Sequence, residues 1–134
     1  MKPQIIKEFS ILLVEDDSVA NYLATHKLNH LGIENVSCVE NGLDALTYIE
    51  NNTCPDIIFL DINMPIMDGF EFLAEKEANN MCPDSKVVIV TSSLRPCDRE
   101  KSNEFTSVVD FLEKPLSYPK IEDILLKISL NRVA

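Results

Sequence analysis

Residues 56–69 read DIIFLDINMPIMDG, and this stretch decides the fold that the sequence predicts. Its beginning is a short apolar run with the length and composition of a buried strand. Asp61 ends the run, and a proline and a glycine follow in what we expect to be a loop. Asp68 and Glu71 then have the spacing of a capping box, which predicts that a helix begins there.

Similar apolar runs recur along the chain, with amphipathic helical patterns between them. The five strands predicted in this way are Phe9 to Val14, Asn35 to Val39, Asp56 to Leu60, Lys86 to Val90 and Ser107 to Leu112. Strands that alternate with helices are typical of a parallel sheet covered by helices. The sequence therefore predicts a single α/β domain, in which no repeat or linker interrupts the pattern.

Apolar residues spaced three or four positions apart predict the helices between these strands. The first helix includes Val19 and Leu28, and we expect it to end near Gly32, a residue suited to a helix C-terminus. The fourth contains CDREKSNE (97–104), which has almost no apolar face, so we expect that helix to be short, exposed and mobile. The last helix has the clearest apolar stripe: Ile121, Ile124, Leu125 and Ile128.

Length and composition exclude several classes of protein. The 134 residues include 12 basic and 22 acidic side chains, for a formal net charge of −10. This length fits one domain, and no apolar run is long enough to span a membrane. The start, MKPQIIKEFS, lacks the apolar segment of a secretory signal, so we expect a cytoplasmic protein. The acidic excess argues against direct nucleic-acid binding, because affinity for phosphates comes from Lys and Arg.

The four cysteines, Cys38, Cys54, Cys82 and Cys97, include no C-x-x-C pair. They are also too evenly spread for a zinc site. We therefore expect four free thiols, buried or half-buried, in a reducing compartment.

Polar residues follow four of the predicted strands, at the sheet edge where parallel α/β folds bind ligands. Taken singly, each has an ordinary structural role, such as a helix cap for Asp17. The residues are Glu15, Asp16 and Asp17 after the first strand, Asp61 after the third, Thr91, Ser92 and Ser93 after the fourth and Lys114 after the fifth.

Taken together, these side chains predict a metal site and a phosphoryl acceptor. Carboxylates about 4 Å apart repel one another by roughly 4 kcal/mol at an effective dielectric constant of about 20, so the group needs a cation. Oxygen ligands alone favour Mg²⁺ over zinc. A carboxylate beside Mg²⁺, a hydroxyl and a lysine can accept a phosphoryl group, because the cations neutralise the transferring oxygens. Asp61, alone at the end of the central strand, is the expected nucleophile.

These residues resemble the receiver domain of two-component response regulators. The resemblance lies in Glu15-Asp16-Asp17, DINMPIMDG (61–69), Val90-Thr91-Ser92 and FLEKP (111–115), and it extends over roughly residues 8–130. It implies a CheY-like, flavodoxin-like (βα)₅ fold with a doubly wound five-stranded parallel sheet in the order 2-1-3-4-5. The sequence looks more like stand-alone receivers than like those fused to DNA-binding domains, so residues 1–134 are expected to form one receiver domain without an effector domain.

The resemblance also implies roles for Asp61 and for the residues around it. Asp61 would accept the phosphoryl group of a histidine kinase or a histidine phosphotransfer protein. Asp16, Asp17, Asp61 and the backbone carbonyl of Asn63 would surround Mg²⁺. Asn63 and Ser93 would flank the path of the water that hydrolyses the acyl phosphate.

A conformational switch is the last feature that the resemblance implies. Thr91 and Lys114 would bind the phosphoryl group, and the peptide bond between Lys114 and Pro115 would be cis. As Thr91 moves, Phe111 would turn inward and change the surface formed by the fourth helix, the fifth strand and the last helix. That surface would dock an unidentified downstream protein.

Two other functions share parts of this pattern of residues. A Mg²⁺-dependent phosphohydrolase of the haloacid-dehalogenase kind would usually need a second acidic residue two positions after the nucleophile, where this chain has Asn63. A pseudo-receiver that binds partners without phosphate would not need the full set of acidic, hydroxyl and lysine residues. We therefore expect a signalling protein that catalyses only its own phosphorylation and dephosphorylation.

Two leucines of the last helix, Leu126 and Leu130, lie off its main apolar stripe and are expected to be partly exposed. Single exposed leucines are ordinary on protein surfaces. We therefore expect a monomer or a weak homodimer.

Overall fold

The computed structural model describes residues 9–93 and 95–133, which form an α/β fold in three layers. The sequence predicts no secretory signal in the first residues of the chain, and it predicts a core that begins near residue 8. Both predictions concern residues outside this range. All five strands are parallel and form one sheet in the order β2-β1-β3-β4-β5, which confirms the predicted flavodoxin-like topology. The strands are β1 (Ser10–Val14), β2 (Asn35–Val39), β3 (Ile57–Leu60), β4 (Lys86–Thr91) and β5 (Val108–Glu113).

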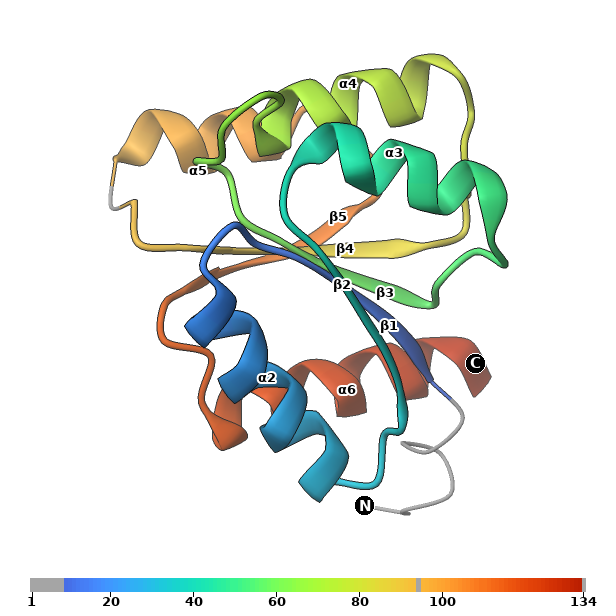
Figure 1. The fold of residues 1–134 in the computed structure, drawn as a ribbon, viewed down its shortest axis with the longest axis vertical. Helices are drawn as coiled ribbons and strands as arrows, with labels where there is room; N and C mark the ends of the chain where they lie inside the picture. Colours follow the sequence, from blue (N-terminus) through green and yellow to red (C-terminus); the bar gives the residue numbers. More distant parts are fainter. Residues whose placement is uncertain (1–8, 94, 134) are drawn as a thin grey trace.

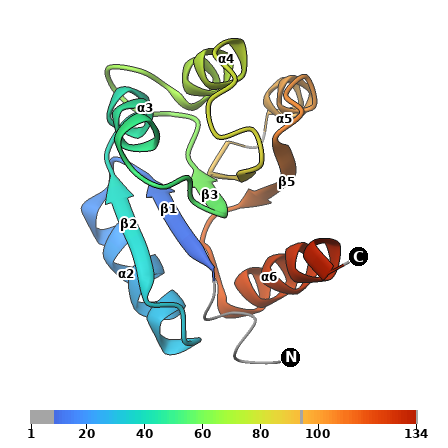
Figure 2. The same ribbon diagram turned by 90° about the vertical axis from the view of Figure 1, so that its right-hand side faces the viewer.

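Helices cover both faces of the sheet. In Figures 1 and 2, α2 and α6 lie on one face, and α3, α4 and α5 lie on the other. The helices are α2 (Ser18–His30), α3 (Gly42–Asn51), α4 (Gly69–Ala78), α5 (Pro96–Ser102) and α6 (Tyr118–Val133). No helix in the described part of the chain is long and apolar enough to cross a membrane.

The central strands are apolar along their whole length because both faces of the sheet are buried. Alternate residues of a strand point to opposite faces. Leu13 and Phe59 therefore pack with the stripe of α6 in one core, while Leu12 and Ile58 pack under α3 and α4 in the other. All four residues of β3 are at most 3% exposed, so the segment that decides the fold also lies at its centre.

Helix boundaries follow the predicted local signals. Asp68 and Glu71 form the capping box at the start of α4: the Glu71 N–H donates to Asp68 Oδ1 (2.8 Å) and the Asp68 N–H donates to Glu71 Oε1 (3.0 Å). Gly32, with a φ of 96°, follows the end of α2, where a left-handed residue is common. Helix α5 has seven residues and is short as predicted, and its inward side chains are the polar Asp98 and Ser102.

The expectation of four free thiols is wrong for two of the cysteines. Cys54, in the loop before β3, and Cys82, in the loop before β4, form a disulfide across 28 residues, whereas Cys38 and Cys97 are free and exposed. The bond lies at the amino-terminal edge of the sheet, away from the edge where Asp61 follows β3. It gives no support to the predicted reducing compartment, because disulfides are rare in cytosolic proteins.

We expect reduction of this disulfide to lower the free energy of unfolding by about 3–4 kcal/mol, because a cross-link over 28 residues restricts the unfolded chain. Thermal unfolding with and without dithiothreitol measures the change. The double variant Cys54→Ser/Cys82→Ser should unfold at the same temperature with or without reductant. Titration of the unreduced, denatured protein should detect only the thiols of Cys38 and Cys97, and detection of all four would contradict the pairing.

Candidate functional site

The backbone around Asp61 holds its side chain at the carboxyl edge of the sheet. The Asp61 N–H donates to the Val14 carbonyl (3.0 Å), which continues the pairing of β1 and β3 by one residue. A Cβ atom on Gly69 would lie 2.4 Å from the Asp61 carbonyl oxygen. Glycine is therefore required at this position, because it lets the start of α4 pack directly on the end of β3.

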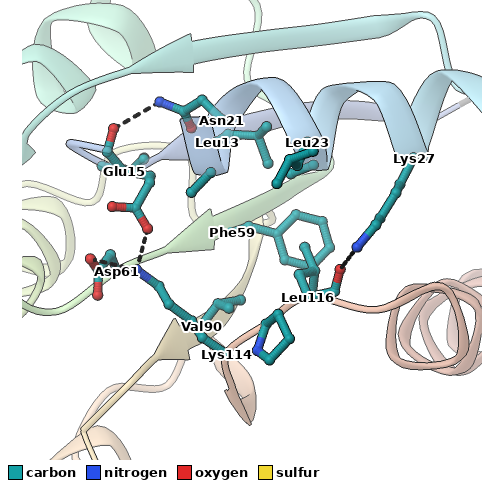
Figure 3. A pocket seen from close by; sticks show the side chains of 14 residues that line it. Leu13, Glu15, Asn21, Leu23, Lys27, Phe59, Asp61, Val90, Lys114 and Leu116 are labelled. Atoms are coloured by element: carbon teal, nitrogen blue, oxygen red, sulfur yellow. Dashed lines mark hydrogen bonds and ion pairs between the residues drawn. The ribbon is translucent and has the colours of Figure 1, made fainter. Parts of the chain in front are cut away.

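Three carboxylates meet at this edge. One oxygen each from Glu15, Asp16 and Asp61 lie within 4.8 Å of one another. The Lys114 ammonium reaches the same place from the end of β5, contacting the Glu15 carboxylate and, at 3.2 Å, Asp61 Oδ2 (Figure 3). The bond between Lys114 and Pro115 is cis, as the resemblance implies.

Burial and charge act together on this group. Burial raises the pKa of Glu15 above its ordinary value, although hydrogen bonds from Lys114 and from the Asp17 backbone oppose the change. Burial lowers the pKa of Lys114, but the hydrogen bond to Glu15 and the charges of Asp61 and Glu15 outweigh it, so that pKa is raised. Lys114 therefore stays protonated, and its one ammonium faces a group of three acidic side chains. An oxygen-only donor set with this charge fits Mg²⁺.

Asp17, a predicted metal ligand, lies outside this group. Asp17 Oδ1 accepts hydrogen bonds from the N–H groups of Val19 (2.9 Å) and Ala20 (3.4 Å), so its carboxylate caps α2. Glu15, which we did not include among the predicted ligands, occupies the place expected of Asp17. Asn63 lies exposed in the loop two residues after Asp61, and the role of its carbonyl stays a prediction.

A chain of hydrogen bonds connects Thr91 to α5. Thr91 is fully buried at the end of β4, and its Oγ1 accepts a bond from the Ser93 N–H (3.1 Å). The Ser93 hydroxyl donates to Asp98 Oδ2 (2.6 Å), and Arg95 donates to the same oxygen through Nε (3.1 Å) and Nη2 (3.0 Å). Sequence reasoning missed Asp98, because the segment 97–104 has almost no apolar pattern that would indicate which of its residues point inward.

Phe111 and Thr91 lie on the same face of the sheet. In the β4–β5 register, Phe111 pairs with Ile89, two residues before Thr91. The Phe111 ring is half-buried against the core under α3 and α4, and the Arg99 guanidinium of α5 lies 5.3 Å from its centroid. Thr91 and Phe111 are therefore diagonal neighbours in the β4–β5 pairing.

Comparison with known proteins identifies the family. The family model of the response regulator receiver domain matches residues 11–126. The chain is a response regulator receiver domain. Two-component response regulator 24 from Arabidopsis thaliana is 34% identical over 128 residues, which are 95% of this chain and 89% of that protein. The sensor histidine kinase CheAY from Helicobacter pylori is 31% identical over 82% of this chain, but over only 14% of its own length.

Solved structures of other receiver domains share the fold. A two-component response regulator from Cytophaga hutchinsonii has a TM-score of 0.79 and 28% identity, over 91% of this chain and 96% of that one. The receiver domain of a sensor histidine kinase from Pseudomonas aeruginosa has a TM-score of 0.79 and 27% identity, over 90% of this chain and 97% of that one. That structure has a magnesium ion coordinated in its active site cleft.

In this receiver domain we expect Asp98→Asn to lower the free energy of unfolding by about 1–3 kcal/mol at neutral pH, because it weakens buried, charge-assisted hydrogen bonds. The Ser93 hydroxyl lowers the pKa of Asp98, burial opposes this effect, and Arg95 lowers the pKa further. The stabilisation is therefore complete above the unfolded pKa of about 3.9 and is lost as the pH falls through the folded value.

Urea unfolding of the wild type and Asp98→Asn between neutral and acidic pH measures this difference. Asp123→Asn, at an exposed position of α6, is the matched control and should change stability little at any pH. A loss in Asp98→Asn that is the same at neutral pH and well below pH 4 would show that the charge of Asp98 has no part in it.

Proposed function

We propose that this receiver domain accepts a phosphoryl group on Asp61 from a histidine kinase or a histidine phosphotransfer protein and then signals by binding another protein. The observation that supports this most is the position of the Asp61 carboxylate. It is buried at the end of the central strand, contacts Lys114, and has the carboxylates of Glu15 and Asp16 beside it. The arrangement combines a nucleophile, a fixed cation and a place for a divalent metal.

Glu15, Asp16 and Asp61 would hold Mg²⁺, together with the backbone carbonyl of Asn63. When bound, Mg²⁺ would neutralise charge on the phosphoryl oxygens and orient them. The magnesium in the related Pseudomonas receiver domain supports this assignment. The proposal takes Glu15 in place of Asp17, because the Asp17 carboxylate is engaged in capping α2.

Several residues of the chain have separate roles in the phosphoryl transfer. Asp61 Oδ1 accepts a hydrogen bond from the Ile62 N–H (2.8 Å), which fixes the orientation of the carboxylate. An oxygen of Asp61 attacks the phosphorus, and the phosphorus–nitrogen bond of the donor phosphohistidine breaks, so that the imidazole leaves. The Lys114 ammonium then binds a phosphoryl oxygen and gives up its contact with Asp61.

The Thr91 hydroxyl would couple phosphorylation of Asp61 to a change in the shape of the surface. A phosphoryl group carries about −1.5 to −2 charges, by analogy with other phosphorylated side chains, and these replace the single negative charge of the Asp61 carboxylate. The Thr91 Oγ1 would then leave the Ser93 N–H, and its hydroxyl would donate a hydrogen bond to a phosphoryl oxygen. Phe111 would turn into the space that Thr91 leaves, and the surface of α5, β5 and α6 would change shape.

The alternatives and the remaining predictions have less support. Membership of the receiver family favours a signalling module over a phosphohydrolase, and the three carboxylates beside Lys114 favour a phosphate-dependent receiver over a pseudo-receiver. The net charge of −10 argues against direct nucleic-acid binding.

A single-domain organisation, a cytoplasmic location and a monomer or weak homodimer stay predictions. Leu126 and Leu130 are 43% and 58% exposed, and a dimer would use this face of α6.

Incubation with Mg²⁺ and acetyl phosphate or phosphoramidate should add one phosphoryl group to the intact mass of the protein. The gain should depend on Mg²⁺ and be lost in Asp61→Asn, which removes the nucleophile. Asp17→Asn is the matched control and should be phosphorylated, because asparagine caps a helix as well as aspartate does. A phosphoryl adduct on Asp61→Asn, or none on the wild type, would contradict the proposal.

Measurements of Mg²⁺ affinity show whether Glu15 or Asp17 is a metal ligand. In calorimetric titrations, Glu15→Gln and Asp16→Asn should each weaken Mg²⁺ binding by about tenfold or more, because even residues that only support metal ligands have effects of this size. Asp17→Asn should bind Mg²⁺ nearly as well as the wild type. A greater loss of Mg²⁺ affinity in Asp17→Asn than in Glu15→Gln would show that the metal ligand is Asp17 and not Glu15.

A further inference from the structure

The disulfide between Cys54 and Cys82 is a second reactive group of the domain, at the edge of the sheet opposite to Asp61. It joins the loop after α3 to the loop after α4, and these two helices lie side by side on one face of the sheet (Figures 1 and 2). The bond therefore connects the carboxyl ends of α3 and α4. The proposed phosphorylation makes no use of it.

The two halves of the disulfide differ in their access to solvent. Cys54 is exposed. Cys82 is only 7% exposed and packs in the core under α3 and α4, where its Sγ lies 3.8 Å from the Ile49 carbonyl oxygen. A thiolate from solution therefore has access to the bond from the side of Cys54. Exposed disulfides are the ones that take part in thiol–disulfide exchange, whereas structural ones resist reduction.

The loop that carries Cys82 has an unfavourable backbone conformation. Asn80 and Cys82 have φ values of 52° and 45°, in the left-handed region that residues with a Cβ atom rarely adopt. Asparagine enters this region more readily than cysteine does. Strained disulfides, like exposed ones, are typically labile and regulatory. Both the access to Cys54 and the conformation of Cys82 therefore favour reduction of this bond.

Hydrogen bonds outside the disulfide also hold the two loops together. The Ser85 hydroxyl donates to the Pro55 carbonyl. The Lys86 N–H donates to the Asp56 carbonyl (3.0 Å), and the pairing of β3 with β4 begins at the next residue, Ile57. The loops should therefore stay close together in the reduced protein, so that the bond can form again without unfolding.

The amino ends of α3 and α4 have a separate connection. The Gly42 N–H donates to the Met67 carbonyl (2.9 Å), which joins the start of α3 to the segment that leads into α4. Gly69, the first residue of α4, packs directly on the backbone of Asp61. Loss of the disulfide would therefore loosen the carboxyl ends of the two helices and leave their amino ends, beside Asp61, in place.

We propose that the bond between Cys54 and Cys82 is a reversible redox switch that responds to dithiols and controls the mobility of the carboxyl ends of α3 and α4. A thiolate of the dithiol attacks Cys54 Sγ and forms a mixed disulfide. The bond to Cys82 breaks, and Cys82 leaves as a thiolate that takes up the proton released by the dithiol.

The second thiol of the reductant then attacks the mixed disulfide and releases the Cys54 thiol. The reductant becomes a cyclic disulfide, and its two electrons and two protons end on the two cysteines. Such a bond is compatible with the predicted cytoplasmic location, because disulfides in reducing compartments are usually transient or redox-sensing.

The kinetics of reduction test whether the native bond is attacked directly. The variant Cys38→Ser/Cys97→Ser, called the two-cysteine variant below, removes the two free, exposed thiols. It is incubated with dithiothreitol, free thiols are blocked with N-ethylmaleimide, and intact mass gives the reduced fraction. We expect a rate that is proportional to dithiothreitol and unchanged by urea below the unfolding transition. A rate that rises steeply with urea would show that the bond reacts only after unfolding, and would overturn the proposal.

Single-cysteine variants test the point of attack. In the two-cysteine variant, the further change Cys82→Ser leaves Cys54 alone, and Cys54→Ser leaves Cys82 alone. Circular dichroism confirms that both are folded. We expect the Cys54 thiol to react with Ellman's reagent about tenfold or more faster than the Cys82 thiol, because reactivity follows exposure. Equal rates would contradict attack from the side of Cys54.

NMR relaxation tests the effect on the helices. In the two-cysteine variant, reduction should lower the backbone order parameters of residues 52–54 and 80–84 from about 0.85 toward about 0.6 and leave those of α6 unchanged. Oxidised glutathione should re-form the bond in the folded protein and restore the values. Unchanged order parameters after reduction, or failure to re-form the bond, would overturn the proposal. Mg²⁺ and phosphodonors are absent throughout, so these results do not depend on the proposed phosphorylation.

Discussion

The contact of one ammonium with two carboxylates organises the carboxyl edge of this sheet. Lys114 lies between Glu15 and Asp61, and each of these residues follows a different strand. Parallel strands end at the same edge, so the fold brings together groups that are about 50 residues apart in the sequence. Without Lys114 the carboxylates would repel one another, and with it they still have room for a divalent cation. The site therefore depends on the register of the strands as much as on the identity of its residues.

The sequence predicted the fold well because the decisive signals are local. The four residues of β3 are apolar and lie at the centre of the sheet, and the pairing of Asp68 with Glu71 at the start of α4 involves neighbours in the chain. Gly32 at the end of α2 is also a local signal, because it depends only on neighbouring residues of the chain. Features that need two distant segments to meet were missed. Cys54 and Cys82, 28 residues apart, were expected to be free thiols because no local pattern shows that their loops touch.

The sequence predicted part of the cluster of side chains at this edge, and the roles of its residues stay predictions. Asp61 and Lys114 were expected together, and the structure brings them to 3.2 Å. Glu15 and Asp17 could not be distinguished in the same way, because adjacent acidic residues differ only in the direction that the backbone gives them. Asp17 has extended φ and ψ values of −87° and 111°, which turn its carboxylate toward the first N–H groups of α2. A helix cap and a metal ligand therefore look alike in sequence, and the backbone decides between them.

Helix α5 is connected to the site through polar contacts and to the core through cation–π contacts. Its inward side chains are Asp98 and Ser102, so it has little apolar area to hold it to the sheet. Asp98 instead fixes the loop after β4 through Ser93, which in turn bonds Thr91. Elements with few apolar contacts open at low free energy and are suited to conformational switching. A change at Thr91 would thus act on a helix that has few apolar contacts.

We propose that Asp61, and no other carboxylate of the group, receives the phosphoryl group. Sodium borohydride reduces an aspartyl phosphate to homoserine and so marks the phosphorylated residue permanently. After reaction with Mg²⁺ and acetyl phosphate, peptide mapping by mass spectrometry should find homoserine at position 61 and unmodified acids at Glu15, Asp16 and Asp17. Homoserine at position 16 or 17, with Asp61 unmodified, would contradict the account.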